Sequence, residues 1–238
     1  MLTAYIPYMF FDYWYLVLVV PALAVAIWAQ IKVSTTFKKY SRYSISSGLT
    51  GEQASRLIQE KNGIRVPCQP IAGSLSDHYD PRTNTISLSE PVYGVSSVAA
   101  VGVAAHETGH ALQYAQGYRP IRLRMGLVPV TNFASALSPW LLILGLAFSF
   151  QPLAYLGVAF FGLSVVFQLV TLPVEFNASS RALAALADGQ MLTQDELKAA
   201  KKVLSAAAMT YVAALLVSLM QFLRLLLIVL GVILVYYI

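Results

Sequence analysis

The chain has 238 residues, of which 58% are hydrophobic and only 11% are charged, and its mean hydropathy is +0.65. A soluble domain carries about 25% charged residues, so the composition excludes an ordinary soluble globule and indicates a membrane protein. The net charge is +5, but 16 scattered Lys and Arg residues are too few for a nucleic-acid binder. The single cysteine, Cys68, cannot form an internal disulfide.

Long apolar runs predict about four transmembrane helices. The first run, residues 13–31, has 19 uncharged residues, enough to cross a hydrocarbon core of ~30 Å. No basic residue precedes it, which favours an uncleaved anchor over a signal peptide. The next run suits a helical hairpin over 128–173, broken at Gln151-Pro152. The last span lies within 206–238 and contains Arg224, which is either close to an interface or inside the bilayer and facing protein.

The distribution of basic residues predicts the orientation of these spans. Eleven of the 16 Lys and Arg residues lie between Lys32 and Arg124, and four more lie between 181 and 202. None precedes the first span or follows Arg224. Because cytoplasmic loops carry an excess of Lys and Arg, we expect a multi-pass plasma-membrane protein with both polar segments in the cytoplasm. Both termini are then outside, and the lipid bilayer is an expected partner.

The polar segment 32–124 is expected to form a catalytic unit that faces the cytoplasm. Thr50 predicts the N-cap of an amphipathic helix that ends at Asn62-Gly63. The runs 64–66 and 85–89 alternate with period two, which predicts two short strands. Ser96 and Gly117 bound a predicted helix over 96–117, whose first half is apolar all round.

This predicted helix contains the sequence His106-Glu107-Thr108-Gly109-His110, an H-E-x-x-H motif. A spacing of four places both histidines on one helix face, where two imidazoles can bind one ion. Glu107 lies beside them and can take a proton from a zinc-bound water, whose pKa the metal lowers towards ~7. At the chain's own composition, a chance match is expected on the order of once in a thousand such sequences. We therefore predict one catalytic Zn²⁺ per chain, with Glu107 as the base.

A catalytic zinc usually has three protein ligands and one open position. The residues leave two sources for the third ligand, His78 or a downstream carboxylate. Glu175 is the first charged residue after the hairpin and lies in a segment, 174–205, whose start is rich in small residues. Such a helix can approach the motif helix closely. The candidates for stabilising an oxyanion or contacting substrate are His78, Tyr79, Arg181 and Tyr211.

Glu175 follows His110 by 65 residues, in the sequence Glu175-Phe176-Asn177-Ala178. The two motifs together resemble the membrane gluzincins, which include the HtpX-type heat-shock proteases and the CAAX prenyl-protein proteases. Nearly the whole chain is similar to a closer group, the bacterial integral-membrane neutral zinc metallopeptidase family (YugP-like proteins). The similarity includes the anchor, the segment 77–82 and the extension of the first motif to Gln113. The resemblance implies that His106, His110 and Glu175 bind zinc and that Glu107 is the catalytic base.

The resemblance carries two more implications. The HtpX-type pattern has an Asp four residues after the ligand Glu, where this chain has Ser179. A group other than Ser179 is therefore expected to orient the zinc-binding histidines. The second implication is that one strand is the active-site edge that pairs with an extended substrate. This strand consists of Thr85, Ile86, Ser87, Leu88 and Ser89.

Together these patterns predict a mainly α polytopic membrane protein with a small α+β, gluzincin-like metallopeptidase domain and a short sheet. The expected function is a membrane zinc metalloendopeptidase that acts on extended or misfolded polypeptides, a substrate class that rests on family analogy. Two alternatives stay open. One is a zinc-binding membrane scaffold without proteolytic activity, and the other is an intramembrane-cleaving zinc protease.

Overall fold

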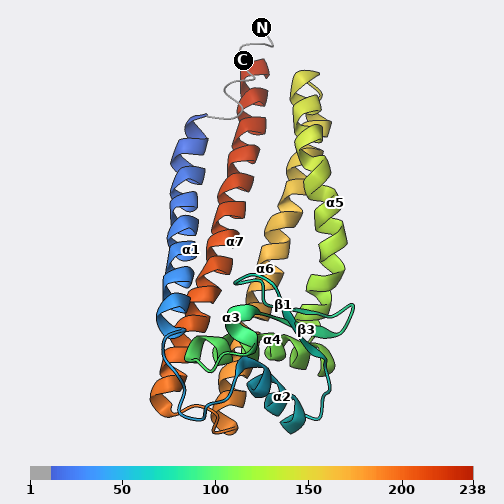
Figure 1. The fold of residues 1–238 in the computed structure, drawn as a ribbon. Coiled ribbons are helices and arrows are strands. Elements are labelled where there is room, and N and C mark those ends of the chain that lie inside the picture. Colours follow the sequence, from blue (N-terminus) through green and yellow to red (C-terminus); the bar gives the residue numbers. More distant parts are fainter. Residues whose placement is uncertain (1–11, 238) are drawn as a thin grey trace. The chain divides into compact units, whose positions relative to one another are not determined.

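The computed structural model shows a mainly helical protein with one small three-stranded sheet (Figure 1). It describes residues 12–237, with side chains as far as residue 231. The two chain ends, which were expected outside the cell, therefore lie beyond the described residues. Four described helical segments are long and apolar enough to cross a membrane, which confirms the predicted fold class. They are Tyr15–Tyr40, Arg119–Ala147, Gln151–Asp188 and Gln194–Gly231.

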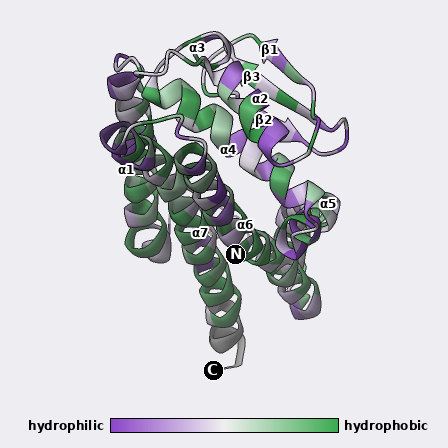
Figure 2. Cartoon of the chain, turned by 90° about the horizontal axis from the view of Figure 1, so that it is seen from below, coloured by the Kyte–Doolittle hydropathy of each residue, from purple (hydrophilic) through white to green (hydrophobic). Residues whose placement is uncertain are grey.

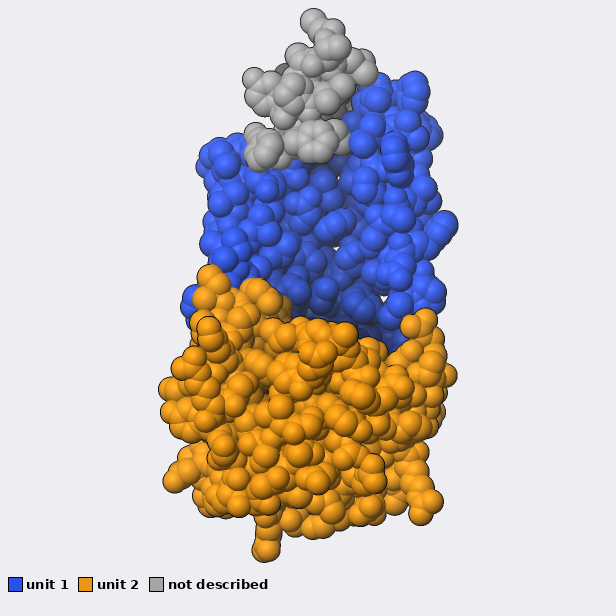
Figure 3. All heavy atoms as spheres, in the orientation of Figure 1, with its two compact units in different colours: residues 1–28, 123–172, 211–238 blue, residues 29–122, 173–210 orange. Residues whose placement is uncertain are grey.

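The chain divides into two compact units, coloured separately in Figure 3. Each unit contains pieces from distant parts of the sequence, because four long helices begin in one unit and end in the other. Unit 1 consists of residues 1–28, 123–172 and 211–238, and unit 2 consists of residues 29–122 and 173–210. In Figure 2 the long helices are coloured mostly as hydrophobic, whereas hydrophilic residues gather on the strands and their loops.

The helices that contribute to unit 1 are longer than the predicted spans. A π-helical turn, η3 (Tyr15–Val19), continues into α1 (Val20–Tyr40). The hairpin consists of α5 (Arg119–Ala147) and α6 (Gln151–Asp188), and the turn between them places Ser149 at a φ of 53°. The last helix, α7 (Gln194–Tyr237), is continuous over 44 residues.

Arg224 is buried within unit 1, where its side chain contacts protein. Its side chain is paired with Asp12, with Nη2 and Nε lying 2.6 and 2.8 Å from Oδ2 of the carboxylate. The guanidinium also lies 5.1 Å from the centre of the Tyr15 ring. A buried charge is tolerated when it is paired and hydrogen-bonded, so Asp12 and Tyr15 together account for its position.

Unit 2 contains the sheet, in which one of the two predicted strands is present at its predicted bounds. The helix α2 (Gly51–Lys61) begins with a capping box formed by Thr50 and Gln53. The predicted strand 64–66 is absent, because the Val66 N–H donates to the side chain of Gln59 at 2.7 Å instead of to a neighbouring strand. The strands are β1 (Cys68–Ile71), β2 (His78–Asp80) and β3 (Thr85–Ser89).

The strand β3 has the predicted bounds, but its predicted role is wrong. The strand order is β1-β3-β2, so β3 is central. It pairs in parallel with β1, where Cys68 lies opposite Ile86, and antiparallel with β2, where Tyr79 lies opposite Ile86. Both edges of β3 are therefore occupied by the protein itself, and an extended substrate cannot add to it. The edge strands of the sheet are β1 and β2.

The helix α4 (Val98–Ala115) carries the H-E-x-x-H motif and runs through the core of unit 2. Ser97 caps its start, with the side chain accepting from the Ala100 N–H at 3.2 Å. A short helix, α3 (Glu90–Tyr93), links β3 to the segment before α4. The apolar first half of α4 is buried against other parts of unit 2, which explains why it has no hydrophilic face.

The helix α6 continues through Pro173 into unit 2, so Glu175 lies on the same helix as the second hairpin span. The sequence favoured a separate helix after the hairpin. Proline removes only its own N–H from the helix ladder, and transmembrane helices tolerate this loss. As a consequence, the second span of the hairpin continues without a break into the helical turn that carries Glu175.

Candidate metal centre

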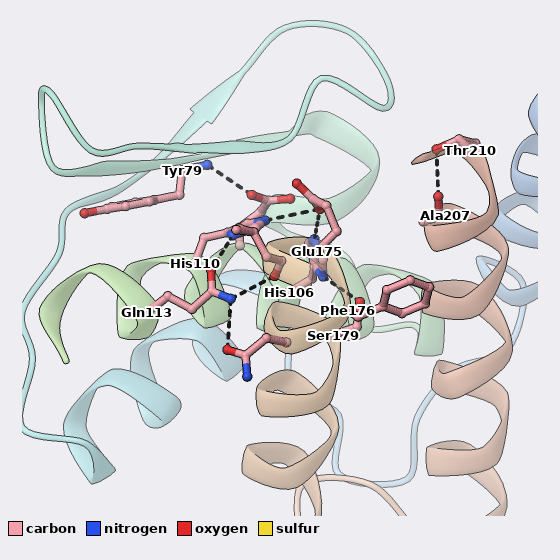
Figure 4. A network of polar contacts seen from close by, with 12 residues as sticks. Tyr79, His106, His110, Gln113, Glu175, Phe176, Ser179, Ala207 and Thr210 are labelled. Carbon is pink, nitrogen blue, oxygen red and sulfur yellow. Dashed lines mark hydrogen bonds and ion pairs between the residues drawn. The ribbon is translucent and has the colours of Figure 1, made fainter. Parts of the chain in front are cut away.

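The structure brings His106, His110 and Glu175 together inside unit 2 (Figure 4). One ligand atom from each residue lies within 4.8 Å of the other two. Oε2 of Glu175 is 3.3 Å from Nε2 of His106 and 3.5 Å from Nε2 of His110. The Glu175 side chain is 1% exposed. The donor set, two imidazole nitrogens and one carboxylate oxygen, is the set that catalytic zinc sites of the His₂Glu type use, so these residues fit a zinc ion.

Glu107 follows His106 on α4, and its carboxylate is held by the sheet. Its Oε2 accepts a hydrogen bond from the backbone N–H of Tyr79 on β2, at 3.0 Å. Burial raises the pKa of the Glu107 carboxyl to about 7; neighbouring His106 lowers it in part, and Glu175 and Asp77 add to the rise. A carboxyl group with a pKa near neutrality can both accept and release a proton at physiological pH.

Each motif histidine has a polar partner on the ring nitrogen that faces away from Glu175. Nδ1 of His106 lies 3.1 Å from Oγ of Ser179, and Nδ1 of His110 lies 3.0 Å from Oε1 of Gln113. The expectation that the orienting group is one other than Ser179 is therefore wrong for His106. The serine hydroxyl reaches the ring from the same position, four residues after Glu175, at which the HtpX-type pattern has Asp.

The helices α4 and α6 approach each other closely at the motif. A Cβ atom built on Gly109 would lie 2.6 Å from the carbonyl oxygen of Ala178. Only glycine fits at this position without moving the backbone of one helix. The second variable position of H-E-x-x-H thus permits the contact that brings Glu175 within reach of the histidines.

The other predicted site residues lie outside the His-His-Glu cluster. His78 is exposed, and its Nδ1 lies 2.9 Å from the Ser76 carbonyl. The Tyr79 hydroxyl donates to Asn84 at 2.8 Å, so this residue reaches the cluster through its backbone. Arg181 donates to Asn177 at 2.7 Å and to Gln116. Tyr211 belongs to unit 1.

Gln113 and Asn177 lie in the two predicted motifs, but no role was predicted for either residue. Gln113 is fully buried between His110 and α6. Asn177 accepts from Gln113 at 3.0 Å and from Arg181. Helical spacing offered a signal for both residues, since positions three or four apart on a helix are neighbours. Gln113 is three residues after His110, and Asn177 is four residues before Arg181.

A His-His-Glu cluster on two helices, with a buried carboxylate beside it, defines a candidate zinc site in a helical membrane protein. Comparison with known sequences identifies the family to which this membrane protein belongs. The chain belongs to the family described as "Putative neutral zinc metallopeptidase", whose model matches residues 15–230. This result confirms the predicted family, and the family description names the predicted metal.

The chain is also similar to a bacterial relative, the "Putative membrane protease YugP" of Bacillus subtilis (strain 168). The two sequences are 47% identical over 211 residues, which are 88% of this chain and 94% of the relative. No solved structure matches the chain.

Proposed function

We propose that the protein is a membrane metalloendopeptidase of the H-E-x-x-H gluzincin type, which hydrolyses peptide bonds in extended or misfolded polypeptides. The observation that carries the proposal is the convergence of His106, His110 and Glu175 within 4.8 Å, beside the buried carboxylate of Glu107. The family and the name of the bacterial relative, a membrane protease, support it.

In this proposal the two histidines and Glu175 hold the metal, and Glu107 moves the proton. Zinc supplies a Lewis acid and lowers the pKa of a bound water. Glu107 stays in place because the Tyr79 N–H fixes one of its carboxylate oxygens. The carboxylate can then accept a proton from that water and pass it to the leaving amine.

The sheet geometry favours β2 as the strand that an extended substrate joins. The N–H and C=O of one residue in an antiparallel strand point to the same side. The Tyr79 N–H points to Glu107, so the Tyr79 carbonyl also faces the side of β2 away from β3. A polypeptide that adds to this edge places its backbone next to Glu107. Binding through backbone groups gives affinity with little sequence selectivity, as unfolded substrates require.

The proposal includes a location in the plasma membrane, with the active site facing the cytoplasm. The basic residues support this orientation, because 15 of the 16 Lys and Arg residues lie between Lys32 and Lys202, outside the predicted spans. Substrates would then be cytoplasmic polypeptides or the cytoplasmic parts of membrane proteins.

The test compares Glu107→Gln with Glu175→Gln and with a control, Glu60→Gln, which alters an exposed glutamate on α2. Zinc content and cleavage of a labelled unfolded polypeptide are measured on detergent-solubilised full-length protein. We expect Glu107→Gln to keep zinc and to lose about 10²–10⁴-fold in cleavage rate, because the proton acceptor is gone. Glu175→Gln should lose zinc, and the control should match wild type.

Unchanged cleavage by the Glu107→Gln variant would show that another group is the base and would refute the proposed mechanism. Wild-type protein that binds zinc and cleaves no polypeptide would support the scaffold alternative instead. Full zinc occupancy after Glu175→Gln would remove Glu175 as a ligand.

A further inference from the structure

Gln113 is a polar residue beside the cluster that is completely buried, with 0% exposure. It lies one helical turn after His110 on α4 and makes contacts at both ends of its amide (Figure 4). Oε1 is 3.0 Å from Nδ1 of His110. Nε2 donates to the backbone carbonyl of Val174 at 2.8 Å and to Oδ1 of Asn177 at 3.0 Å.

These contacts fix which way the amide points. The Val174 carbonyl can only accept a hydrogen bond, so it must face the NH₂ end of the amide. The Asn177 side chain is fixed in the same sense, because Arg181 Nε, which can only donate, bonds to the same Oδ1 at 2.7 Å. The carbonyl end of Gln113 must therefore face His110.

The orientation of Gln113 determines where His110 carries its proton. An amide oxygen can only accept, so Nδ1 of His110 must be the donor. With the proton on Nδ1, the lone pair of a neutral imidazole lies on Nε2, the nitrogen that is 3.5 Å from Glu175. The partner of His106 does not impose this choice, because the Ser179 hydroxyl can donate or accept.

We propose that Gln113 is a positioning residue, which holds His110 in the metal-binding tautomer and ties it to the helix that carries Glu175. Val174 directly precedes Glu175, so a single side chain couples one ligand to the backbone of another. The inference rests on the proposed zinc site, and it assigns to a neutral amide the orienting role that a carboxylate often has in zinc sites.

The test uses three variants of the full-length protein in detergent. Gln113→Leu removes both ends of the amide at similar volume. Gln113→Glu keeps an acceptor for His110 but cannot donate to Val174. The control, Gln116→Leu, removes an amide three residues further on, which contacts Arg181. The measurements are zinc affinity, by competition with a chelator of known affinity, and the unfolding midpoint of the metal-free protein.

We expect Gln113→Leu to weaken zinc binding by about 10–100-fold. Gln113→Glu should bind zinc within about fivefold of wild type and yet unfold at a lower temperature, because its carboxylate faces the Val174 carbonyl. Zinc-loaded protein with ¹⁵N-labelled histidine should show an Nδ1–H signal that Gln113→Leu removes and Gln113→Glu keeps. Gln116→Leu should leave zinc affinity and the Nδ1–H signal unchanged.

A merely structural role predicts a different pattern. In that case zinc affinity follows stability, and Gln113→Glu binds zinc as weakly as Gln113→Leu; this result would overturn the inference. So would a Gln113→Leu variant with wild-type affinity, while leaving the proposed function intact. A wild-type protein that binds no zinc would instead refute the proposed function, and the inference with it.

Discussion

The backbone and the side chain of Tyr79 have different hydrogen-bond partners. Its backbone N–H holds Glu107, whereas its hydroxyl donates to Asn84 in the turn before β3. Burial raises the pKa of the phenol to about 12, with the neighbouring Tyr114 ring contributing. The hydroxyl is therefore neutral across the physiological range. Tyr79 was among the predicted oxyanion candidates, but in the structure its hydroxyl is bonded to Asn84.

We therefore expect Tyr79→Phe to retain cleavage within about threefold of wild type. The backbone N–H is unchanged, and the loss of one partly buried hydrogen bond costs about 1 kcal/mol of stability. Steady-state cleavage and thermal unfolding of the metal-loaded protein check both expectations. A loss of rate of 100-fold or more, with normal zinc content, would show that the phenol takes part in the chemistry.

The residues of the candidate metal centre were predictable to different extents. The spacing of His106 and His110 indicated a shared helix face without reference to any fold, and family resemblance then indicated Glu175. The partners Ser179 and Gln113 were harder to assign, because their roles depend on the distance between α4 and α6. That distance is set by contacts such as Gly109 against Ala178, which lie far apart in the sequence.

At the scale of elements, the contact between α4 and α6 depends on Gly109. A methyl group there would lie 2.6 Å from a backbone carbonyl, which no rotamer change can relieve. Gly102, on the same helix, is different, because a methyl group there would lie 3.6 Å from the Ala200 side chain, an ordinary contact distance. Substitution of Gly102 is therefore a control, on the same helix, for substitution of Gly109.

We expect Gly109→Ala to destabilise the protein by about 1–3 kcal/mol, as overpacking does, and to weaken zinc binding by separating the ligands. Gly102→Ala should be neutral or stabilise by about 0.5–1 kcal/mol, because alanine favours a helix over glycine. Thermal unfolding and zinc competition on both variants check this. Equal behaviour of the two variants would contradict the close approach of α4 and α6.

Helices and strands were predictable where the sequence pattern and the backbone hydrogen bonds favour the same secondary structure. The strand Thr85–Ser89 was predicted at its observed bounds, but its place in the sheet was not, because alternation says nothing about which strands flank it. The strand predicted at 64–66 failed because the Gln59 side chain binds the Val66 N–H. The segment 174–205 was expected to begin a separate helix after the hairpin, yet α6 continues through Pro173.

At the scale of the whole molecule, four apolar helices and a one-sided distribution of charge lead to the proposed orientation. The expected topology places the β1–β2 loop in the cytoplasm and the α5–α6 turn outside. Ser74 and Ser149 are exposed residues in these two segments. The native Cys68 is half-buried, and burial raises its pKa to about 11, so it reacts slowly and can be replaced by Ser.

In a Cys68→Ser background, we expect Ser149→Cys to react with a membrane-impermeant maleimide on intact cells. Ser74→Cys should react only after the cells are permeabilised. The measurement is the extent of labelling before and after permeabilisation, with the Cys68→Ser protein as the control. Labelling of Ser74→Cys on intact cells would reverse the proposed orientation and place the metal centre outside.

The pairing of Asp12 with Arg224 joins residues that are 212 positions apart. During synthesis, the first span leaves the ribosome long before α7 has been made. Asp12 therefore has no Arg224 to pair with until nearly the whole chain has been synthesised. The arginine lies in a helix that is apolar enough to cross a membrane, where an isolated charge is costly. The ion pair is therefore one of the last contacts to form in unit 1, and a chain truncated before α7 lacks the group that neutralises Asp12.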